Sequence, residues 1–327
     1  MKNTKGYEVI SLFSGCGGLD LGFKGGFDVL GKKYSKRKFK IIWANDFDSK
    51  ACETFSKNFE SPIVCGDISE LLNDRYPQSS PKMPSKADVV LGGFPCQDFS
   101  IAGKRKGFEG NRGKLYKSMV LAVQNTRPAI FVAENVKGLL SMDNGKAIET
   151  IIKDFAELGY SVVYKLHHAA DFGVPQNRER VLIVGTDKKR GLPEFDFPKP
   201  THTKENWVTL EHTISDLENK IEGEAHNHFW SKAKMLKGTQ GNSITSKDKI
   251  SPTMRAEHHG NIEFHWNGNR RLSAREAARI QTFPDNFIFY PSTSSAYKQI
   301  GNAVPPVLGW NIAKSVEKFL DTHYLNK

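Results

Sequence analysis

A single cysteine lies in a segment whose residue types suit nucleophilic chemistry. Cys96 follows Gly92-Gly93-Phe94-Pro95 and precedes Gln97-Asp98-Phe99-Ser100, directly after the apolar run 89–91. A thiolate adds to an electrophile and leaves again readily, and nearby positive charge can lower the pKa of a thiol. A buried structural cysteine is the common alternative, but the position after a strand and a proline favours a nucleophile at Cys96.

A glycine turn near the N-terminus is a candidate cofactor site. The segment Phe13-Ser14-Gly15-Cys16-Gly17-Gly18 ends the first apolar run, and its glycines allow a tight turn and close approach of the backbone to a ligand. Asp46 ends a second run, where a carboxylate suits ribose hydroxyls, and Asp67 follows a third, where it could accept from an adenine amino group. The alternative is a structural turn with two capping acids. This pattern is compatible with a nicotinamide dinucleotide and with S-adenosylmethionine.

Apolar runs of strand length alternate with helical patterns through roughly the first 190 residues. The runs cover 9–13, 41–44, 89–91, 130–133 and 181–184, and apolar residues recur at helical spacing over 115–123 and 148–158. This alternation predicts an α/β domain with a mostly parallel sheet. The basic run 32–40 is expected to be a solvated loop before the second strand.

The segment from about 187 to 268 lacks this regularity. It contains three prolines between 193 and 200, scattered aromatic residues and seven histidines, with one helical pattern around 210–217. Ser273 and Glu276 then form a capping box ahead of a short helix, and a last helix follows Pro305 and Pro306. We therefore divide the chain into a main domain of residues 1–187 and 297–327 and a smaller, irregular domain with a hinge, residues 188–296.

Composition narrows the class of protein. The chain has 327 residues, of which 38% are hydrophobic, and no window approaches the roughly 20 apolar residues of a membrane span. Because the N-terminus has no apolar signal-peptide core, we expect a cytoplasmic protein. The net charge of +11 favours a polyanionic partner. The four cysteines have neither metal nor disulfide spacing and none accompanies the histidines, so we predict no bound metal.

Six motifs occur in the order known from one enzyme family. Residues 92–100 resemble the nucleophile motif of the cytosine-C5 DNA methyltransferases, and the resemblance covers nearly the whole chain. The further motifs are the cofactor turn 13–18, the acid motif 134–136, the arginine motif 176–180, the motif beside the recognition domain 271–284 and the terminal cofactor motif 301–306. The resemblance implies a Rossmann-like S-adenosylmethionine-dependent fold in which 188–296 is a target-recognition domain. It also implies a bacterial restriction-modification enzyme in the cytosol.

The resemblance assigns catalytic roles to four residues. Cys96 would add to C6 of a cytosine, which makes C5 able to attack a methyl sulfonium. Glu134 would protonate or hydrogen-bond N3, and Arg178 and Arg180 would lie near the pyrimidine O2. Strand alternation places both arginines on one face, with surface ion pairing as the alternative. No residue is an obvious base for the C5 proton.

The resemblance also implies which residues contact the cofactor, S-adenosylmethionine. They belong to the glycine turn, to the ends of the following strands and to the terminal motif. We predict the following set: Phe13, Ser14, Gly15, Gly17, Gly18, Asp46, Phe47, Asp67, Ile68, Pro95, Leu115, Asn302 and Ala303.

A basic, glycine-rich segment follows the nucleophile. Residues 98–117 contain six lysines and arginines against two acids, which suits a loop that closes over a phosphate backbone, although a solvated charge run is the alternative. Such contacts would offset the cost of flipping the target base out of the duplex. The predicted DNA-binding residues are Ser100, Lys104, Arg105, Lys106, Arg112 and Arg255. Gln240, Asn242 and Asn267 are further candidates for reading bases.

Four functions compete for these observations. The first is a monomeric enzyme that modifies duplex DNA, with a cognate restriction endonuclease that shares its target site. The second is a tRNA methyltransferase of the same family. The third is a dinucleotide-dependent oxidoreductase, which leaves Cys96, Glu134 and the arginine pair unexplained. The fourth is a catalytically silent DNA reader, against which the intact catalytic residues argue.

Overall fold

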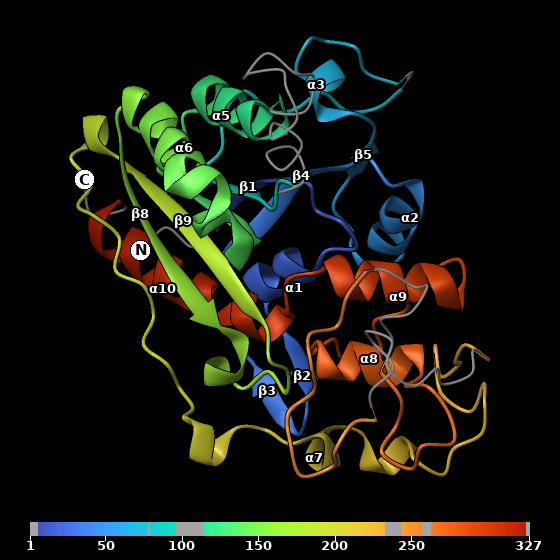
Figure 1. Cartoon of the computed structure of the whole chain (residues 1–327). Helices are drawn as coiled ribbons and strands as arrows, with labels where there is room; N and C mark the ends of the chain where they lie inside the picture. The colour runs from blue at the N-terminus through green and yellow to red at the C-terminus, as the bar shows by residue number, and fades with distance from the viewer. Residues whose placement is uncertain (1–5, 78, 96–113, 233–243, 257–262, 325–327) are drawn as a thin grey trace, which may run out of the picture.

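A seven-stranded sheet forms the centre of the molecule (Figure 1). The computed structural model describes all residues except 1–5, 78, 96–113, 233–243, 257–262 and 325–327. In the described part of the chain the strand order is β5-β4-β1-β6-β7-β9-β8. These strands are β1 (Tyr7–Leu12), β4 (Phe39–Asp46), β5 (Ile63–Cys65), β6 (Val89–Gly92), β7 (Ile130–Val136), β8 (Tyr160–His168) and β9 (Glu179–Asp187).

The sheet is mostly parallel, which confirms the prediction. Strand β1 pairs in parallel with β4 and β6, and β9 runs antiparallel to both its neighbours, β7 and β8. From β1 the chain first continues to β4 and β5 on one side of the sheet and then crosses to β6 and β7 on the other side. The strand order therefore reverses direction at β1. In open α/β sheets a ligand crevice forms at the carboxyl ends of the strands at such a point.

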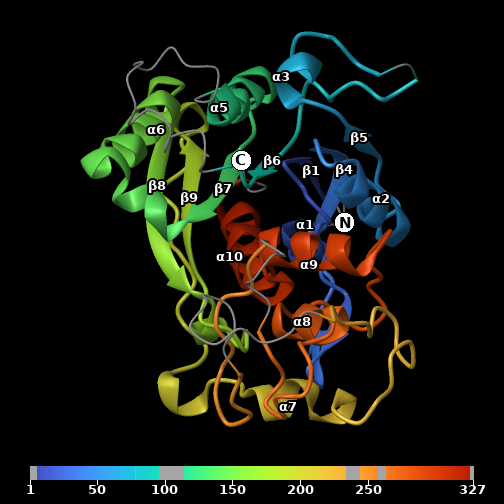
Figure 2. The ribbon, with the colours of Figure 1, turned by 45° about the vertical axis from the view of Figure 1, so that its right-hand side comes forward.

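Helices cover both faces of this sheet (Figure 2). Side chains alternate along β1, so that Val9 joins the apolar cluster on one face while Ile10 joins the cluster on the other. One face is covered by α1 (Gly18–Lys24), α2 (Ser49–Asn58) and α10 (Pro306–His323), and the other by α3 (Ile68–Leu71), α5 (Lys114–Thr126) and α6 (Lys146–Glu157). The contact between α1 and α10 is close, because a Cβ on Gly22 would lie 2.6 Å from the carbonyl carbon of Gly309.

The described part of residues 188–296 is irregular, as expected. It contains α7 (Leu210–Ile214), α8 (Ala274–Ile280) and the start of α9 (Thr293–Asn302), which extends past the expected boundary at residue 297. The capping box is confirmed, since Glu276 N donates to Ser273 Oγ and Ser273 N donates to Glu276 Oε2. Leu210, Met254 and Leu272 belong to the same buried cluster as the sheet residue Val9. These apolar side chains therefore attach the region to the main domain.

The basic run 32–40 is not simply a loop, which corrects the expectation. Strand β3 (Lys32–Tyr34) pairs antiparallel with β2 (Phe27–Val29). Tyr34 stacks on Phe27 with ring centroids 5.1 Å apart, and Arg37 lies over Trp310 of α10 at 4.9 Å. The aromatic side chains interleaved with the lysines thus fold the run against α10.

None of the helices that the structure describes is both long and apolar enough to cross a membrane.

Candidate functional site

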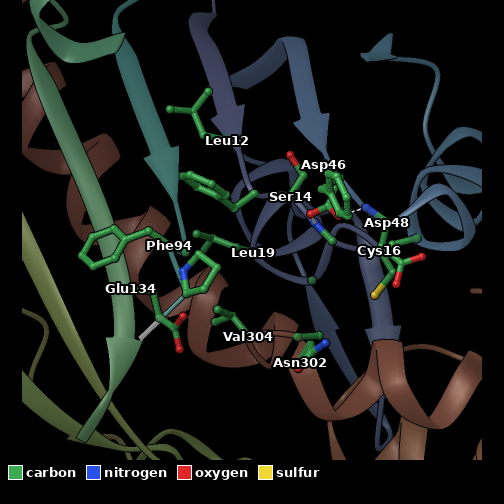
Figure 3. A pocket seen from close by; sticks show the side chains of 18 of the residues that line it. Leu12, Ser14, Cys16, Leu19, Asp46, Asp48, Phe94, Glu134, Asn302 and Val304 are labelled. Carbon is green, nitrogen blue, oxygen red and sulfur yellow. Dashed lines mark hydrogen bonds between the residues drawn. The ribbon is translucent and has the colours of Figure 1, made fainter. Parts of the chain in front are cut away.

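A cavity of about 1230 Å³ lies at the carboxyl ends of β1, β4, β6 and β7 (Figure 3). It brings together residues from distant parts of the sequence, including the glycine turn, the acid motif and the terminal motif. Glu134 and Arg180 line it, as do all but one of the predicted cofactor residues: Phe13, Ser14, Gly15, Gly18, Asp46, Phe47, Asp67, Ile68, Pro95, Leu115, Asn302 and Ala303. Gly17 is absent from the lining.

The glycine turn has the backbone conformation that its sequence predicts. Gly15 and Gly17 have φ values of 56° and 93°, in the region that favours glycine. A Cβ on Gly17 would lie 2.3 Å from the Phe59 ring, and one on Gly18 would lie 2.4 Å from the carbonyl oxygen of Val304. Gly17 therefore lets the turn pack against the Phe59 ring, and Gly18 lets the terminal motif pack against the turn.

The acidic residues of the cavity also hold its walls in place. Asp46 Oδ2 accepts from Gly15 N at 2.7 Å and Oδ1 accepts from Asp48 N at 2.8 Å, so Asp46 ties the glycine turn to β4. Burial raises the pKa of Asp46 and these hydrogen bonds oppose the rise. Asp67 caps α3 through Ser69 N at 2.8 Å. Asp67 is therefore a helix-capping residue, as the alternative interpretation of the sequence expected. Contacts of Asp46 and Asp67 with the cofactor stay predictions.

An ion pair between Glu134 and Arg180 lies at one end of the cavity. Arg180 Nε and Glu134 Oε1 are 2.7 Å apart, and the side chains are only 12% and 11% exposed. Residue 180 pairs with Val136 across the antiparallel strands, which brings its side chain to the end of β7. A Cβ on Gly93 would lie 3.2 Å from Glu134 Oε2, so the glycine leaves room for that oxygen. Burial lowers the pKa of Arg180, and Glu134 opposes the change.

Arg178 forms no ion pair with Glu134, although Arg180 and Glu134 both act on its pKa electrostatically, so its predicted role near the pyrimidine O2 stays a prediction. It precedes β9 rather than lying in it, so strand alternation does not apply. Its guanidinium is 1% exposed and donates to the carbonyl oxygens of Met254 at 2.9 Å, Gly301 at 2.8 Å and Ala303 at 2.9 Å. Burial lowers the pKa of Arg178 well below its usual value. Arg178 therefore holds the terminal motif against the recognition region.

Asn135 is a site residue that the prediction omitted. Its Nδ2 donates to the carbonyl oxygen of Phe94 at 3.0 Å and thereby fixes the backbone that leads into Pro95. Its place beside Glu134 in the acid motif was the available signal. The predicted nucleophile, Cys96, lies outside the described residues, as do Ser100, Lys104, Arg105, Lys106, Arg112, Gln240 and Asn242.

The described candidates for DNA contact lie in and near the recognition region. Arg255 is exposed, and its backbone packs on the terminal motif, because a Cβ on Gly301 would lie 2.2 Å from the Arg255 carbonyl carbon. Asn267 is also exposed. Lys117, from the basic segment, forms an ion pair with Asp154 at 2.9 Å. Lys117 is therefore already engaged by α6.

The donor groups fit a charged adenosyl cofactor. Phe47 offers an aromatic ring that is 78% exposed, and Asp46 and Asp67 offer carboxylates. Asp20 adds a fully buried carboxylate with no cation among its partners. Both an aromatic face and a surplus of negative charge suit a cationic nucleoside. Within the part of the chain that the structure describes, no group of three or more histidine, cysteine or acidic side chains could hold a metal ion.

Comparisons with known proteins agree with this geometry. The model of the C-5 cytosine-specific DNA methylase family matches residues 7–318. The Neisseria gonorrhoeae type II methyltransferase M.NgoFVII is 41% identical over 97% of this chain and 88% of its own length. The Fusobacterium nucleatum type II methyltransferase M.FnuDI is 36% identical over 96% and 95%. The crystal structure of the S. pombe Dnmt2 methyltransferase shares the fold, with a TM-score of 0.67 at 16% identity over 97% of this chain and 99% of that one. The chain belongs to the C-5 cytosine-specific DNA methylase family.

Proposed function

We propose that the chain is a DNA (cytosine-5-)-methyltransferase that transfers the methyl group of S-adenosylmethionine to C5 of a flipped cytosine in a short duplex sequence. One observation carries the proposal. A single cavity is lined by the glycine turn, by Pro95, which precedes Cys96, and by the Glu134–Arg180 ion pair. A cofactor turn and a base-activating acid in one cavity with Pro95, the residue before the predicted nucleophile, suit methyl transfer to a ring carbon.

The cofactor supplies an activated methyl group on a sulfonium. We assign its adenosine to the side of the cavity formed by Asp46, Phe47 and Asp67, where carboxylates and an aromatic ring line the wall. Asn302 and Ala303 of the terminal motif also line the cavity. The glycine turn brings backbone within reach of the ligand.

Glu134 and Cys96 divide the work of activating the cytosine. The Cys96 thiolate forms a bond to C6, which turns the ring into an enamine whose C5 is nucleophilic. Glu134 holds a proton toward N3, which makes C6 electrophilic. Arg180 fixes Glu134 through Oε1, so Oε2, on the side of Gly93, is the oxygen left for the base. Asn135 positions the nucleophile segment by holding the Phe94 carbonyl.

Duplex DNA is the proposed partner. The net charge of +11 supports a polyanionic substrate, and phosphate contacts by the basic segment after Cys96 would offset the cost of base flipping. Residues 188–296 are the proposed recognition domain, with the exposed Arg255 at its contact with the terminal motif. We expect the protein to act as a monomer.

A role in restriction-modification follows from the relatives. M.NgoFVII and M.FnuDI are both named type II methyltransferases. We propose that the present chain likewise protects host DNA from a cognate endonuclease that cuts the same sequence. DNA from cells that express it should then resist cleavage by endonucleases whose sites contain the methylated motif.

Bisulfite sequencing of DNA from a methylation-free bacterial host that expresses the chain tests the proposal. Protected cytosines in one short motif, absent when Cys96→Ser is expressed, are the expected result. Full protection with Cys96→Ser would refute the assigned nucleophile. No protection by a folded protein that binds S-adenosylmethionine would exclude a DNA substrate, and methyl transfer to tRNA would then identify the other polymer.

A further inference from the structure

Asp20 is a buried carboxylate for which the proposed chemistry gives no role. It lies in the first turn of α1, its side chain is 0% exposed, and neither Oδ1 nor Oδ2 accepts a hydrogen bond of good geometry, the Ser11 hydroxyl and the Asp20 amide being the polar groups nearby. Removing a carboxylate from water without a partner is costly, and buried polar groups in folded proteins are nearly always satisfied. An unsatisfied carboxylate at this depth therefore requires an explanation.

The position of Asp20 points to the cofactor cavity. Asp20 lines it together with Ser11 and Ser14, and Ser14 Oγ donates to Ser11 Oγ at 2.9 Å. The Ser11 hydroxyl keeps its own proton available, and it favours the ionised form of Asp20. The two serines thus connect the buried carboxyl group to the wall of the cavity.

The other carboxylates of this cavity are engaged by groups of the protein itself. Asp46 accepts two backbone amides, Asp67 caps α3, Asp48 binds Lys298 at 2.6 Å and Glu134 binds Arg180 at 2.7 Å. The last two pairs also engage Lys298 and Arg180, the lysine and the arginine in the cavity lining. Among the described lining residues, Asp20 is thus the carboxylate with no cation beside it, and the Ser11 hydroxyl and its own backbone amide are the polar groups that face it.

The electrostatic surroundings of Asp20 favour a cationic ligand. Its pKa is raised to about 7: burial is the largest cause, Asp46 on β4 adds to the rise, and the Ser11 hydroxyl and the backbone amide of Asp20 oppose it. The neighbouring Cys16 thiol is held neutral, because burial and Asp46 raise its pKa. Since the facing charge is negative, a positive charge entering the cavity would stabilise the ionised carboxylate. That attraction is strong where water is excluded.

We propose that Asp20 is the counter-charge for the cationic amino-acid end of S-adenosylmethionine, where the ammonium and the sulfonium lie. The inference rests on the proposed function, which supplies the identity of the ligand. Asp20 acts through the cavity wall, behind Ser11 and Ser14, and is therefore a positioning residue that selects a charged ligand. In the free protein at neutral pH it is partly protonated, and cofactor binding displaces that proton.

Calorimetric titration of Asp20→Asn with three ligands tests this role. S-adenosylmethionine carries both cationic groups, S-adenosylhomocysteine carries the ammonium alone, and 5′-methylthioadenosine, which lacks the amino-acid end, carries neither. Asn matches the shape of Asp without its charge. At pH 8 we expect the variant to bind S-adenosylmethionine about tenfold more weakly, the effect of about one pKa unit, and to bind 5′-methylthioadenosine within about twofold of the wild-type protein. Glu53→Gln, which removes an exposed acid of α2, controls for net charge.

A second measurement needs no variant. Titrating the wild-type protein with S-adenosylmethionine at pH 7 in two buffers of different ionisation enthalpy reports the protons released. Release of a fraction of a proton is expected, as is weaker binding at pH 6 than at pH 8. Asp20→Asn, where it folds, should show neither effect.

The outcomes separate this inference from the proposed function. A loss confined to S-adenosylmethionine identifies the sulfonium as the partner, and an equal loss for S-adenosylhomocysteine identifies the ammonium; both support the role. Equal weakening of all three ligands, unchanged affinities, or the absence of proton release would overturn it. Failure of the wild-type protein to bind S-adenosylmethionine at all would instead reject the proposed cofactor.

Discussion

The Glu134 carboxylate and the Arg180 guanidinium form a 2.7 Å ion pair that joins the antiparallel strands β7 and β9 at the cavity. Both side chains are largely buried, so the pair has a defined geometry that an exposed lysine–glutamate pair would lack. The pair engages one carboxylate oxygen, and Gly93 leaves space beside the other. The ion pair thus orients the proposed acid through Oε1 and leaves Oε2 available for the base.

Replacing the acid should abolish most of the chemistry and spare cofactor binding. Glu134→Gln keeps the size of the side chain but removes the proton held toward N3, so we expect kcat to fall about 10²- to 10⁴-fold. Transfer of a labelled methyl group to DNA measures the rate, and calorimetry measures S-adenosylmethionine affinity. Glu179→Gln is the matched control, because Glu179 binds Lys137 at 2.8 Å instead. Equal activity of the two variants would remove Glu134 from the mechanism.

Arg178 should matter for stability more than Arg180 does. Arg178→Met would leave the carbonyls of Met254 and Gly301 without their buried donor, whereas the Ala303 carbonyl would keep the hydrogen bond from Gln281 Nε2. Because each unsatisfied buried polar group costs about 1–3 kcal/mol, we expect a loss of several kcal/mol and a clearly lower melting temperature in calorimetry. Arg180→Met should destabilise less. A stable but inactive Arg178→Met variant would show that Arg178 has a role in the reaction and not only in stability.

Gly301→Ala should disturb the contact between the recognition region and the terminal motif. The added Cβ would lie 2.2 Å from the carbonyl carbon of Arg255, and backbone cannot move aside as a flexible side chain can. We expect about 1–3 kcal/mol of destabilisation in urea unfolding, with weaker binding of both DNA and S-adenosylmethionine. Gly138→Ala is the control, since its Cβ would meet only Val136 Cγ2 at 3.9 Å. Similar effects of the two substitutions would contradict this contact.

Asp20 should make the free protein less stable as the pH rises. Its pKa is about 7 in the folded protein against an ordinary value of 3.8, so between these values the unfolded chain loses the proton first and becomes favoured. The resulting loss approaches about 4 kcal/mol above pH 7, at 1.36 kcal/mol per unit of pKa. Asp20→Asn should therefore be more stable than the wild-type protein at pH 8 and similar to it below pH 4. Urea unfolding at several pH values checks this, and parallel pH profiles would contradict it.

Local patterns were sufficient to predict a mostly parallel sheet but not strand β8, and the cavity residues were predicted from the family resemblance. The positions of the strands and the spacing of the helices depend on periodicity, which the apolar runs at 9–13 and 130–133 show directly. The role of Arg178 could not be predicted in this way, because its partners Met254, Gly301 and Ala303 are 76, 123 and 125 residues away. Asp20 was missed for the opposite reason, since an acid in the first turn of a helix is ordinary in sequence and unusual only once its burial is known.

The Arg178 guanidinium connects carbonyls of two segments that should respond to different ligands. Met254 belongs to the region proposed to read DNA, whereas Gly301 and Ala303 belong to the wall proposed to hold the cofactor. One rigid, charged group cannot satisfy all three oxygens if either segment shifts alone. If ligand binding moves either segment, occupancy of one site will alter affinity at the other, and thermodynamic reciprocity then requires equal effects in both directions. The buried arginine would thereby make discrimination between DNA sequences depend on whether a methyl donor is present.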